Sequence, residues 1–401
     1  MTRPDPASIL LRQAKRDLDP LSCDYYTAAE CRSCTMLGIP HRDQIASKQA
    51  RIQALLAPYA APEGCAWEEP VYHSPSGFRN KAKMVVGGTT HAPTLGILDR
   101  DRRPVDLRHC ALIDPRIENA FGAVTAMITA CGLAPYDVPK RSGELKNVLI
   151  TVNPDGELMV RFVVRSERSV SALRAALPVL TEQLPHVRVV SVNVLPEHKA
   201  VLEGDREWIL TPESTLPMRL PGLTLELGVK SFFQTNSEIA ADMYQQAVRW
   251  AHDIGAKHAW DLYCGVGGFA LALTAVVESV VGVEVSAEAV AAAKRTAQDT
   301  GLSGVAFVAA DARQWAGQQD CVPDLVVVNP PRRGLGAELA RVLEGSGAQR
   351  VLYSSCQAAT LAEDLAVMTS WRIERARIFD MFPQSDHCEV MVLLTRTEMT
   401  D

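Results

Sequence analysis

A cysteine and a carboxylate in the C-terminal part of the chain have the types and spacing that nucleophilic chemistry requires. Cys356 follows the apolar run RVLYSS, at the point where a buried strand would end. His387 and Glu389 lie on one loop at the start of the last apolar run, VMVLL. A thiol near a histidine and a carboxylate can attack a substrate while a neighbouring group moves a proton. A cysteine at a strand end is also often a packing residue, so Cys356 alone does not define an active site.

The glycine-rich segment DLYCGVGG, residues 261–268, has the composition of a cofactor-binding loop. It lies where a strand becomes a helix, and its glycines allow a tight turn and close approach of a ligand to the backbone. Glu284 follows Gly265 by nineteen residues, at the end of the next apolar run. A carboxylate at this spacing can accept hydrogen bonds from two ribose hydroxyls, so we expect a nucleoside cofactor. In the alternative interpretation the glycines only turn the chain, and Glu284 is a solvated strand end.

The segment NPPRRG, residues 329–334, follows the fourth apolar run of this region. Its two prolines predict a rigid, extended loop that can present Asn329 and carbonyl oxygens to a flat nucleobase or to a cofactor. A plain turn after a strand is the alternative. Together with DLYCGVGG, which lacks the GxGxxG spacing of NAD enzymes, the segment resembles motifs of S-adenosylmethionine-dependent methyltransferases. Methyltransferases that modify the amino group of adenine usually have an aromatic residue after the prolines, where this chain has Arg332.

Four cysteines form a candidate metal-binding set. Cys23, Cys31 and Cys34 lie in a stretch without periodicity, and Cys110 follows about seventy-five residues later. Four thiolates suit tetrahedral zinc or an iron–sulfur cluster, and the spacing is not that of a paired CxxC zinc ribbon. Unrelated buried thiols are the alternative, although the polar surroundings of the first three are unlike a core. The cysteines that follow no ligand pattern are expected to pack: Cys65, Cys131, Cys264, Cys321 and Cys388.

Three regions must position these residues. Residues 1–70 hold the aperiodic stretch with three of the cysteines. Residues 71–230 show short alternating runs, such as KAKMVVGG and VRVVSVNVL, which predict a mostly antiparallel β-rich domain. Residues 231–401 alternate buried strands with alanine-rich helices, which predicts a Rossmann-like parallel sheet with ligands at the carboxyl ends of its strands. The predicted fold class is therefore α/β.

Composition limits the class and the partners of the chain. Its 401 residues, 47% apolar and 22% charged, are typical of a folded protein, and no run reaches the ~20 apolar residues that cross a membrane. The absence of a secretion signal in the first residues predicts a cytoplasmic protein. The net charge of −6 is uneven, because residues 1–110 carry 15 Lys and Arg against 12 Asp and Glu. The basic run FRNKAK, residues 78–83, and the arginines at 100–108 are candidates for contact with a polyanion, with a solvated face as the alternative.

The order and spacing of these motifs resemble one family, the RNA (uracil-5-)-methyltransferases that modify ribosomal and transfer RNA. The resemblance covers about nine-tenths of the chain and includes FFQTN (232–236), DLYCGVGG, NPPRRG, SSC (354–356) and the ending MFP…HCE (381–389). The NPPRRG form, and the lack of an accessory barrel before the first cysteine, are most similar to the bacterial 23S rRNA branch. Two positions depart from the family: Gln357 stands where Asn is common, and Gln384-Ser385 where His-Thr is usual.

The resemblance implies a class I methyltransferase domain that uses S-adenosylmethionine and a covalent mechanism. The thiolate of Cys356 would add to C6 of uracil, which makes C5 nucleophilic enough to take a methyl group. Glu389 would then remove the C5 proton as a base. The positions implied to bind the cofactor are Gln234, Tyr263, Gly265, Glu284 and Asn329.

The same resemblance implies a metal cofactor and an RNA partner. The four cysteines would hold a [4Fe-4S] cluster, with Cys23, Cys31, Cys34 and Cys110 as its ligands. The partner would be a uridine in a hairpin loop of 23S rRNA, at a site of the uracil-747 type, because attack at C6 requires the base to leave its stack. A monomer is expected. The alternatives are the same reaction on another rRNA or tRNA loop, and a non-catalytic, cluster-bearing RNA-binding protein, for which Cys356 and Glu389 would serve no purpose.

Overall fold

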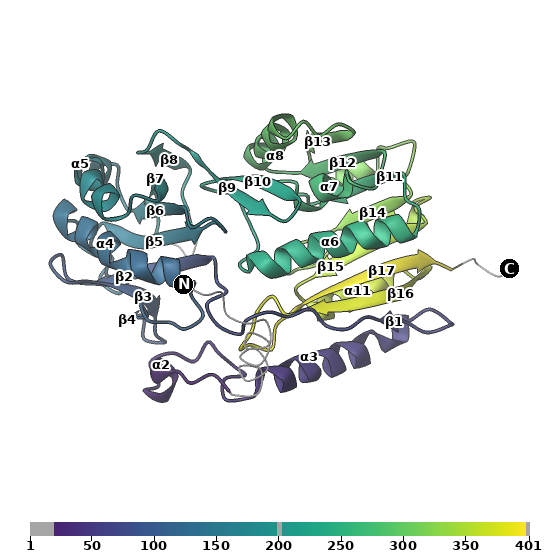
Figure 1. Ribbon diagram of the computed structural model, residues 1–401, viewed down its shortest axis with the longest axis horizontal. Coiled ribbons are helices and arrows are strands. Elements are labelled where there is room, and N and C mark those ends of the chain that lie inside the picture. The colour runs from purple at the N-terminus through teal and green to yellow at the C-terminus, as the bar shows by residue number, and fades with distance from the viewer. Residues whose placement is uncertain (1–19, 199–202, 398–401) are drawn as a thin grey trace, which may run out of the picture.

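The protein is described by a computed structural model that covers residues 20–198 and 203–397 (Figure 1). Two large sheets lie side by side, one of seven strands from the middle of the chain and one of eight strands built mainly from the C-terminal part. A two-stranded hairpin, β9 (Thr215–Leu220) and β10 (Leu223–Gly228), lies between them along the chain and packs with the second sheet. The prediction of an α/β fold is confirmed.

The eight-stranded sheet has the strand order β1-β16-β17-β15-β14-β11-β12-β13. The strands from β11 to β15 are parallel, whereas β17 runs antiparallel to both of its neighbours. The short strand β1 is added at the edge of this sheet, beside β16. Its strands are β1 (Ala66–Trp67), β11 (His258–Leu262), β12 (Ser279–Glu284), β13 (Val305–Ala309), β14 (Leu325–Val328), β15 (Arg350–Ser355), β16 (Trp371–Phe379) and β17 (Glu389–Arg396).

Helices cover both faces of this sheet, because its strands are apolar on both sides. One apolar core packs α6 (Ser237–Asp253), α7 (Gly268–Leu273) and α8 (Ala287–Asp299) with the β9–β10 hairpin against one face. A second core packs four helices against the other face. These are α3 (His41–Leu56), α9 (Ala312–Ala316), α10 (Gly336–Gly345) and α11 (Ala358–Val367).

The seven-stranded sheet has the order β4-β3-β2-β5-β6-β7-β8. All of its neighbouring strands are antiparallel except β6 and β7, which α5 connects as a parallel crossover. Helices α4 and α5 pack together on one face, which forms a third core. The elements are β2 (Lys81–Gly88), β3 (Pro93–Leu98), β4 (Pro104–Asp106), α4 (Pro115–Cys131), β5 (Leu145–Val152), β6 (Leu158–Val164), α5 (Arg168–Gln183), β7 (Val187–Val194) and β8 (Arg206–Ile209).

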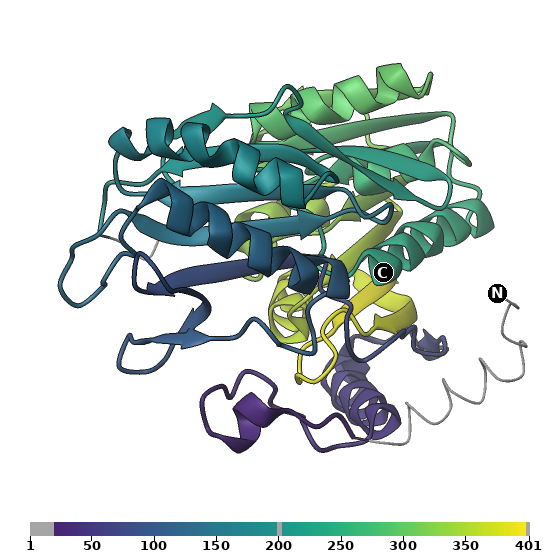
Figure 2. The same cartoon turned by 60° about the vertical axis from the view of Figure 1, so that its left-hand side comes forward.

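The N-terminal segment packs on the eight-stranded sheet although it is far from that sheet in sequence. After the short helix α2 (Asp24–Thr27), α3 lies against α11, a 3-10 turn (Ala57–Tyr59) follows, and β1 pairs in parallel with β16. Figure 2 shows α2 and the chain around it below the rest of the molecule, near the loop that precedes β17. The boundaries at residues 70 and 230 remain predictions, but β1 makes the first region part of the C-terminal sheet.

Asn80 joins the two large sheets at the start of β2. Its side-chain Nδ2 donates to the carbonyl oxygen of Gln234 at 2.9 Å and to Oγ of Ser237 at 2.7 Å. Its backbone N–H donates to the carbonyl oxygen of Thr235 at 3.0 Å. Asn80 and Phe78 are 5% and 8% exposed, so these two residues of the basic run FRNKAK face the interior and hold the loop before α6.

We predict that Asn80→Ala lowers the free energy of unfolding by about 1–3 kcal/mol, because it leaves the partly buried Gln234 carbonyl and Ser237 hydroxyl without this donor. Urea denaturation followed by circular dichroism measures the change. Asn147→Ala, at a half-buried asparagine of β5, is the matched control. Equal losses for the two variants would contradict the role of the Asn80 side chain.

Candidate active site

The pairing of β15 with β17 brings the predicted nucleophile and base together. The two strands are antiparallel, and Ser355 at the end of β15 lies opposite Val390 near the start of β17. Cys356, one residue after β15, therefore lies next to Glu389, the first residue of β17. Ser354 strengthens this junction, because its Oγ donates a hydrogen bond to Oε1 of Glu389 at 3.1 Å.

Glu389 is buried and only partly satisfied. Its side chain is 1% exposed, and its Oε2 has no hydrogen-bond partner among the described residues. Burial raises the pKa of this carboxyl from its ordinary value of 4.5 to about 8, against the opposing effects of the Ser354 hydrogen bond and the Arg332 charge. A carboxylate with a raised pKa binds a proton more tightly than an ordinary one, and the unpartnered oxygen of Glu389 can accept a proton from a ligand.

Cys356 is half-buried, and two charged residues act on its thiol in opposite directions. Burial, and then the nearby Glu389 carboxylate, raise its pKa, whereas Arg332 lowers it by its charge and by a hydrogen bond. Arg332 thus lies close to both groups from an exposed position on the loop after β14. The sequence drew attention to Arg332 only as an unusual residue after two prolines, and its relation to Cys356 depends on the packing of that loop.

The loop that carries Arg332 is held by a buried aspartate. Asp364 of α11 is 5% exposed and accepts from the backbone N–H groups of Leu335 at 2.8 Å and Gly336 at 3.1 Å. It also accepts from the hydroxyl of Tyr353 on β15 at 2.7 Å. Because Tyr353 lies three residues before Cys356, Asp364 fixes the loop relative to the strand that bears the thiol.

The predicted cofactor residues Gly265 and Glu284 meet at the carboxyl ends of β11 and β12. The backbone N–H of Gly265 donates to Oε2 of Glu284 at 3.2 Å, and that of Ser286 donates to Oε1 at 2.9 Å. Gly265 has φ of +55°, and the space where a Cβ would lie is open. Tyr263 also has a positive φ, 69°, which is uncommon for a residue with a side chain. The turn therefore presents open backbone beside a fixed carboxylate.

Asp261, at the start of this segment, is fully buried at the end of β11. Its Oδ2 accepts from the N–H of Ala270 at 2.9 Å, and its Oδ1 has no partner among the described residues. Burial, with a smaller contribution from Glu284, raises the pKa of this carboxyl to about 8. Asp261 links the loop to the first turns of α7, so the glycine-rich turn has a fixed shape.

Asn329 and Gln234 are placed on two sides of this region. Asn329 follows β14, which lies between β11 and β15, so it stands between the glycine-rich turn and Cys356. Gln234 lies just before α6, and its carbonyl is bonded to Asn80 of the seven-stranded sheet. His387, in contrast, is exposed, and its electrostatic effect is exerted on Asp386. The prediction that His387 lies near the Cys356 thiol is therefore not confirmed.

The four cysteines of the candidate metal set lie near one another but do not form a closed site. Burial, and then the charges of Cys110, Cys31 and Cys23, raise the pKa of Cys34 to about 11. The Tyr25 hydroxyl of α2 accepts from the N–H of His109, which brings the loop of Cys110 to this segment. In residues 20–198 and 203–397, no group of three or more His, Cys, Asp or Glu is arranged to hold a metal ion. The four cysteines are thus not arranged among the described residues as the ligands of the predicted iron–sulfur cluster.

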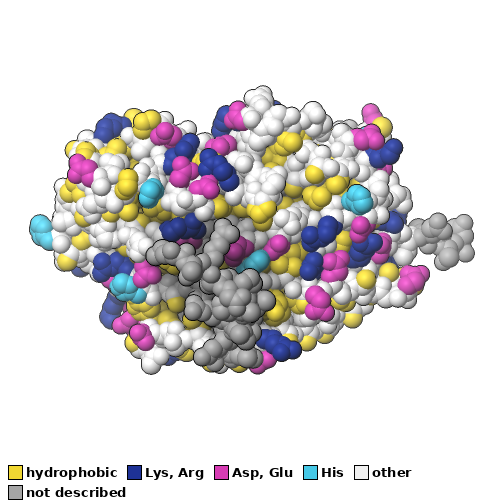
Figure 3. All heavy atoms as spheres, in the orientation of Figure 1, with side chains coloured by type: hydrophobic (Ala, Val, Ile, Leu, Met, Phe, Trp, Pro, Cys, Tyr) yellow, Lys and Arg dark blue, Asp and Glu magenta, His cyan; other side chains and the backbone are white. Residues whose placement is uncertain are grey.

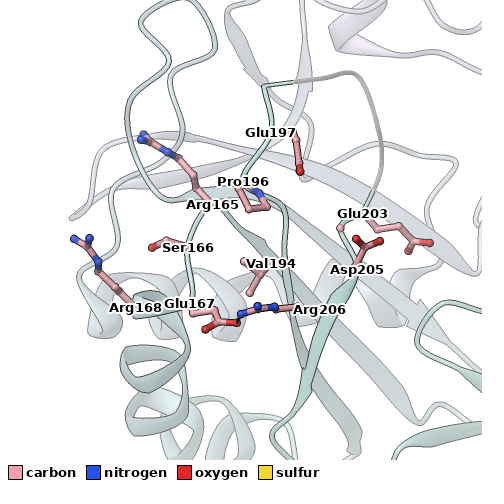
Figure 4. A pocket seen from close by; sticks show the side chains of 11 residues that line it. Arg165, Ser166, Glu167, Arg168, Val194, Pro196, Glu197, Glu203, Asp205 and Arg206 are labelled. Atoms are coloured by element: carbon pink, nitrogen blue, oxygen red, sulfur yellow. Dashed lines mark hydrogen bonds and ion pairs between the residues drawn. The ribbon is translucent and has the colours of Figure 1, made fainter.

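The surface shows a cavity away from these residues. A cavity of about 730 Å³ opens where β6 and β7 end and β8 begins in the seven-stranded sheet. Figure 4 shows that Glu167 and Arg206 in its wall point toward one another, and they form an ion pair. None of the predicted site residues lines this cavity.

The charge distribution gives no single RNA-binding face in the view of Figure 3. Basic and acidic side chains are interspersed over the face shown there. Among the described residues, none of the helices has the length and apolar character needed to cross a membrane.

The strand order, the glycine-rich turn after β11 and the acidic end of β12 together define a methyltransferase of the α/β class. Comparison with known proteins agrees. The family model of the tRNA (uracil-5-)-methyltransferases matches residues 199–397. A 23S rRNA (uracil(747)-C(5))-methyltransferase RlmC from Yersinia pestis strain Pestoides F is 45% identical over 376 residues, which cover 94% of this chain and 99% of the relative. The RlmC of Yersinia enterocolitica is 44% identical over 377 residues, with 94% and 100% covered.

The chain belongs to the RNA uracil-C5 methyltransferase family, and the predicted family is confirmed. Its fold is similar to that of the tRNA (uracil-54, C5)-methyltransferase of Pyrococcus abyssi, with a TM-score of 0.74. The two chains are 21% identical, and the similarity covers 90% of this chain and 85% of that one. At this identity the likeness concerns the fold.

We predict that the stability difference between Glu389→Gln and the unaltered protein changes with pH. Because the pKa of Glu389 is raised in the folded chain, its protonated form stabilises the fold below about pH 4.5, and this contribution is lost as the pH rises through about 8. Glutamine does not ionise, so the Glu389→Gln variant keeps this contribution at high pH. Between about pH 4.5 and 8, the free energy of unfolding of the variant should therefore rise by a few kcal/mol relative to that of the unaltered protein.

Urea unfolding at a series of pH values measures this difference. Glu363→Gln, at an exposed carboxylate of α11, is the matched control. A difference between Glu389→Gln and the unaltered protein that is the same at pH 5 and pH 9 would contradict the raised pKa.

Proposed function

We propose that this protein transfers a methyl group from S-adenosylmethionine to C5 of a uridine in 23S rRNA, through a covalent adduct with Cys356. The observation that carries the proposal is the adjacency of Cys356 and Glu389 across the β15–β17 pair, with one oxygen of Glu389 buried and unpartnered. A binding protein without catalysis would gain nothing from a buried carboxylate that lacks a partner, since such a group costs stability.

The covalent chemistry follows from the weak nucleophilicity of uracil C5. The thiolate of Cys356 adds to C6, and the electron pair of the C5–C6 double bond moves toward O4 to give an enolate. C5 of the enolate then bonds to the sulfonium methyl group, whose bonding pair leaves with sulfur to give S-adenosylhomocysteine. Glu389 takes the proton from C5, the double bond forms again, and the thiolate leaves C6. Arg332, close to both groups, is placed to favour the thiolate before the attack.

The residues at the ends of β11, β12 and β14 fit S-adenosylmethionine. The Glu284 carboxylate is held by two backbone N–H groups and keeps lone pairs for ribose hydroxyls. The open backbone at Gly265 leaves room for the ligand, and Tyr263 precedes it on the same turn. Asn329, between this turn and Cys356, is placed to contact the methionine end. We include Gln234 in the set because its loop is fixed by Asn80 at the start of α6.

The choice of RNA rests on the relatives. Those described above are named for uracil 747 of 23S rRNA and span almost the same length as this chain. The same reaction on a tRNA loop is the second candidate, because the matching family model and the Pyrococcus abyssi enzyme are named for tRNA. An rRNA substrate of a bacterial enzyme would place the protein in the cytoplasm, and we expect it to act as a monomer.

RNA that carries 5-fluorouridine tests the covalent mechanism. After methyl transfer, C5 of this base bears fluorine in place of a proton, so the adduct cannot resolve and should persist as an enzyme–RNA band on a denaturing gel. We predict that the band forms with the unaltered protein and S-adenosylmethionine and is lost in Cys356→Ala. No band with the unaltered protein, or a band that survives in Cys356→Ala, would contradict the mechanism.

The same assay chooses between the RNA candidates. A 23S rRNA hairpin with 5-fluorouridine at position 747 should form the adduct faster than a tRNA loop of equal length with the same base at its target position. The reverse order would favour the tRNA reaction. A 23S hairpin with cytidine at the target position serves as the matched negative control.

We also propose that the four adjacent cysteines hold a [4Fe-4S] cluster. The donor set fits, because Cys23 and Cys31 lie close enough to raise the pKa of both Cys34 and Cys110, and a bound cation would offset this repulsion between thiolates. Cys23, Cys31, Cys34 and Cys110 would ligate the irons, and the cluster would supply a rigid link between the N-terminal segment and the loop after β4.

Anaerobic purification tests the cluster. We predict a brown protein with about four irons per chain, the number in such a cluster, and less iron in Cys34→Ser. Cys65→Ser, at another half-buried cysteine, should keep its iron. A colourless protein that contains zinc would contradict this proposal and leave the methylation proposal intact.

A further inference from the structure

A buried ionic cluster fastens α3 to the loop that leads to Glu389. Asp380, directly after β16, is 1% exposed and lies between Lys48 and His41 of α3. Nζ of Lys48 donates to its Oδ1 at 2.6 Å, and Nε2 of His41 lies 2.7 Å from its Oδ2. The exposed fractions of Lys48 and His41 are also 1%. Lys48 donates in addition to the carbonyl oxygen of Phe382 at 3.2 Å.

Two glutamines make a second contact between α3 and the loop that leads to Glu389. Nε2 of Gln44 donates to Oε1 of Gln384 at 3.0 Å, and the backbone N–H of Gln384 donates to Oε1 of Gln44 at 3.0 Å. Gln384 has φ of 68°, a left-handed conformation that is costly for a residue with a side chain. Gln384 is thus held in this conformation from outside its own loop. Figure 2 shows this loop reaching toward the N-terminal segment.

The polar face of α3 is unusual for a packed helix. His41, Gln44 and Lys48 are spaced by three and four residues, so they share one face, and all three are buried. Apolar residues in these places would stabilise the packing at least as well, because a buried ion pair contributes little after desolvation. Directional polar contacts, in contrast, specify one orientation of the loop. That orientation matters because the loop ends at Glu389, which pairs across the hairpin with Phe379, the residue before Asp380.

We propose that Lys48 is a positioning residue for the base, which acts through Asp380 to hold the 380–388 loop and so the carboxyl of Glu389. This inference rests on the proposed function, because it assigns Lys48 to the step in which Glu389 removes the C5 proton. Lys48 has no part in the attack of Cys356 on C6. Its loss therefore slows resolution of the methylated adduct and leaves formation of the adduct unchanged.

Lys48→Met tests this separation of steps in the full-length protein. With uridine RNA, turnover should fall by about ten- to a hundredfold, as expected when a reacting group is displaced by about 1 Å. A methylated covalent enzyme–RNA intermediate should accumulate at the same time. With 5-fluorouridine RNA, where no proton is removed, the rate of adduct formation should stay within about twofold of the unaltered protein, since proximity at C6 is retained. Lys48→Arg, which keeps the charge, should recover part of the turnover.

Arg42→Met is the matched control, because Arg42 is an exposed cation on the same helix. It should leave both rates unchanged. Asp380→Asn provides a second test if Lys48→Met does not fold, because the amide keeps the shape and one acceptor oxygen; it should show the same pattern as Lys48→Met.

Two outcomes would overturn the inference. One is a Lys48→Met protein that matches Arg42→Met in both assays, and the other is an equal loss of adduct formation and of turnover. Absence of any adduct in the unaltered protein is a different result, because it contradicts the proposed function itself.

Discussion

The geometry of the site depends on one reversed strand. In a wholly parallel sheet all carboxyl ends lie on one edge, and no strand start reaches that edge. Because β17 runs antiparallel to β15, its first residue lies beside the last residue of β15, and Glu389 meets Cys356. A slip of one residue in this register would turn Glu389 to the opposite face of the sheet. The apolar side chains from Val390 to Leu394, which are buried on both faces, hold the register.

Burial makes the carboxyl at this junction reactive and at the same time costs stability. Glu389 and Asp261 both have a pKa of about 8, and each leaves one oxygen without a partner among the described residues. Glu389 also disfavours ionisation of Cys356, so the two groups compete for one negative charge. Arg332 lowers the pKa of both from an exposed loop, where its own charge stays hydrated. The site therefore favours one ionised group at a time, which suits a sequence of addition followed by proton removal.

The local sequence pattern predicted those features that depend on residues close together in the chain. The alternation of strands and helices in residues 231–401 predicted the parallel strands of the C-terminal sheet, which the structure has. The fold and the family were predicted correctly, whereas the roles of the site residues remain predictions. The features that depend on contacts between distant parts of the chain could not be predicted. The buried side of α3 mixes His41, Gln44 and Lys48 with a few apolar residues, so it gave no sign that the helix packs on the C-terminal sheet. The basic run that begins at Phe78 gave no sign that Phe78 and Asn80 face inward.

The N-terminal segment contacts the loop that leads to Glu389. Oγ1 of Thr35, next to Cys34, donates to Oδ1 of Asp386 at 3.1 Å, and the N–H of Met36 donates to the carbonyl of Gln384 at 3.1 Å. Residues directly after Cys34 therefore contact the 380–388 loop, so the candidate cysteine set and that loop are connected through a few hydrogen bonds. Any group that orders the cysteine segment also restricts this loop, because ordering one side of a hydrogen-bonded contact lowers the entropy cost of ordering the other. Ordering of the cysteine segment can in this way affect the position of Glu389 without a direct contact between the two.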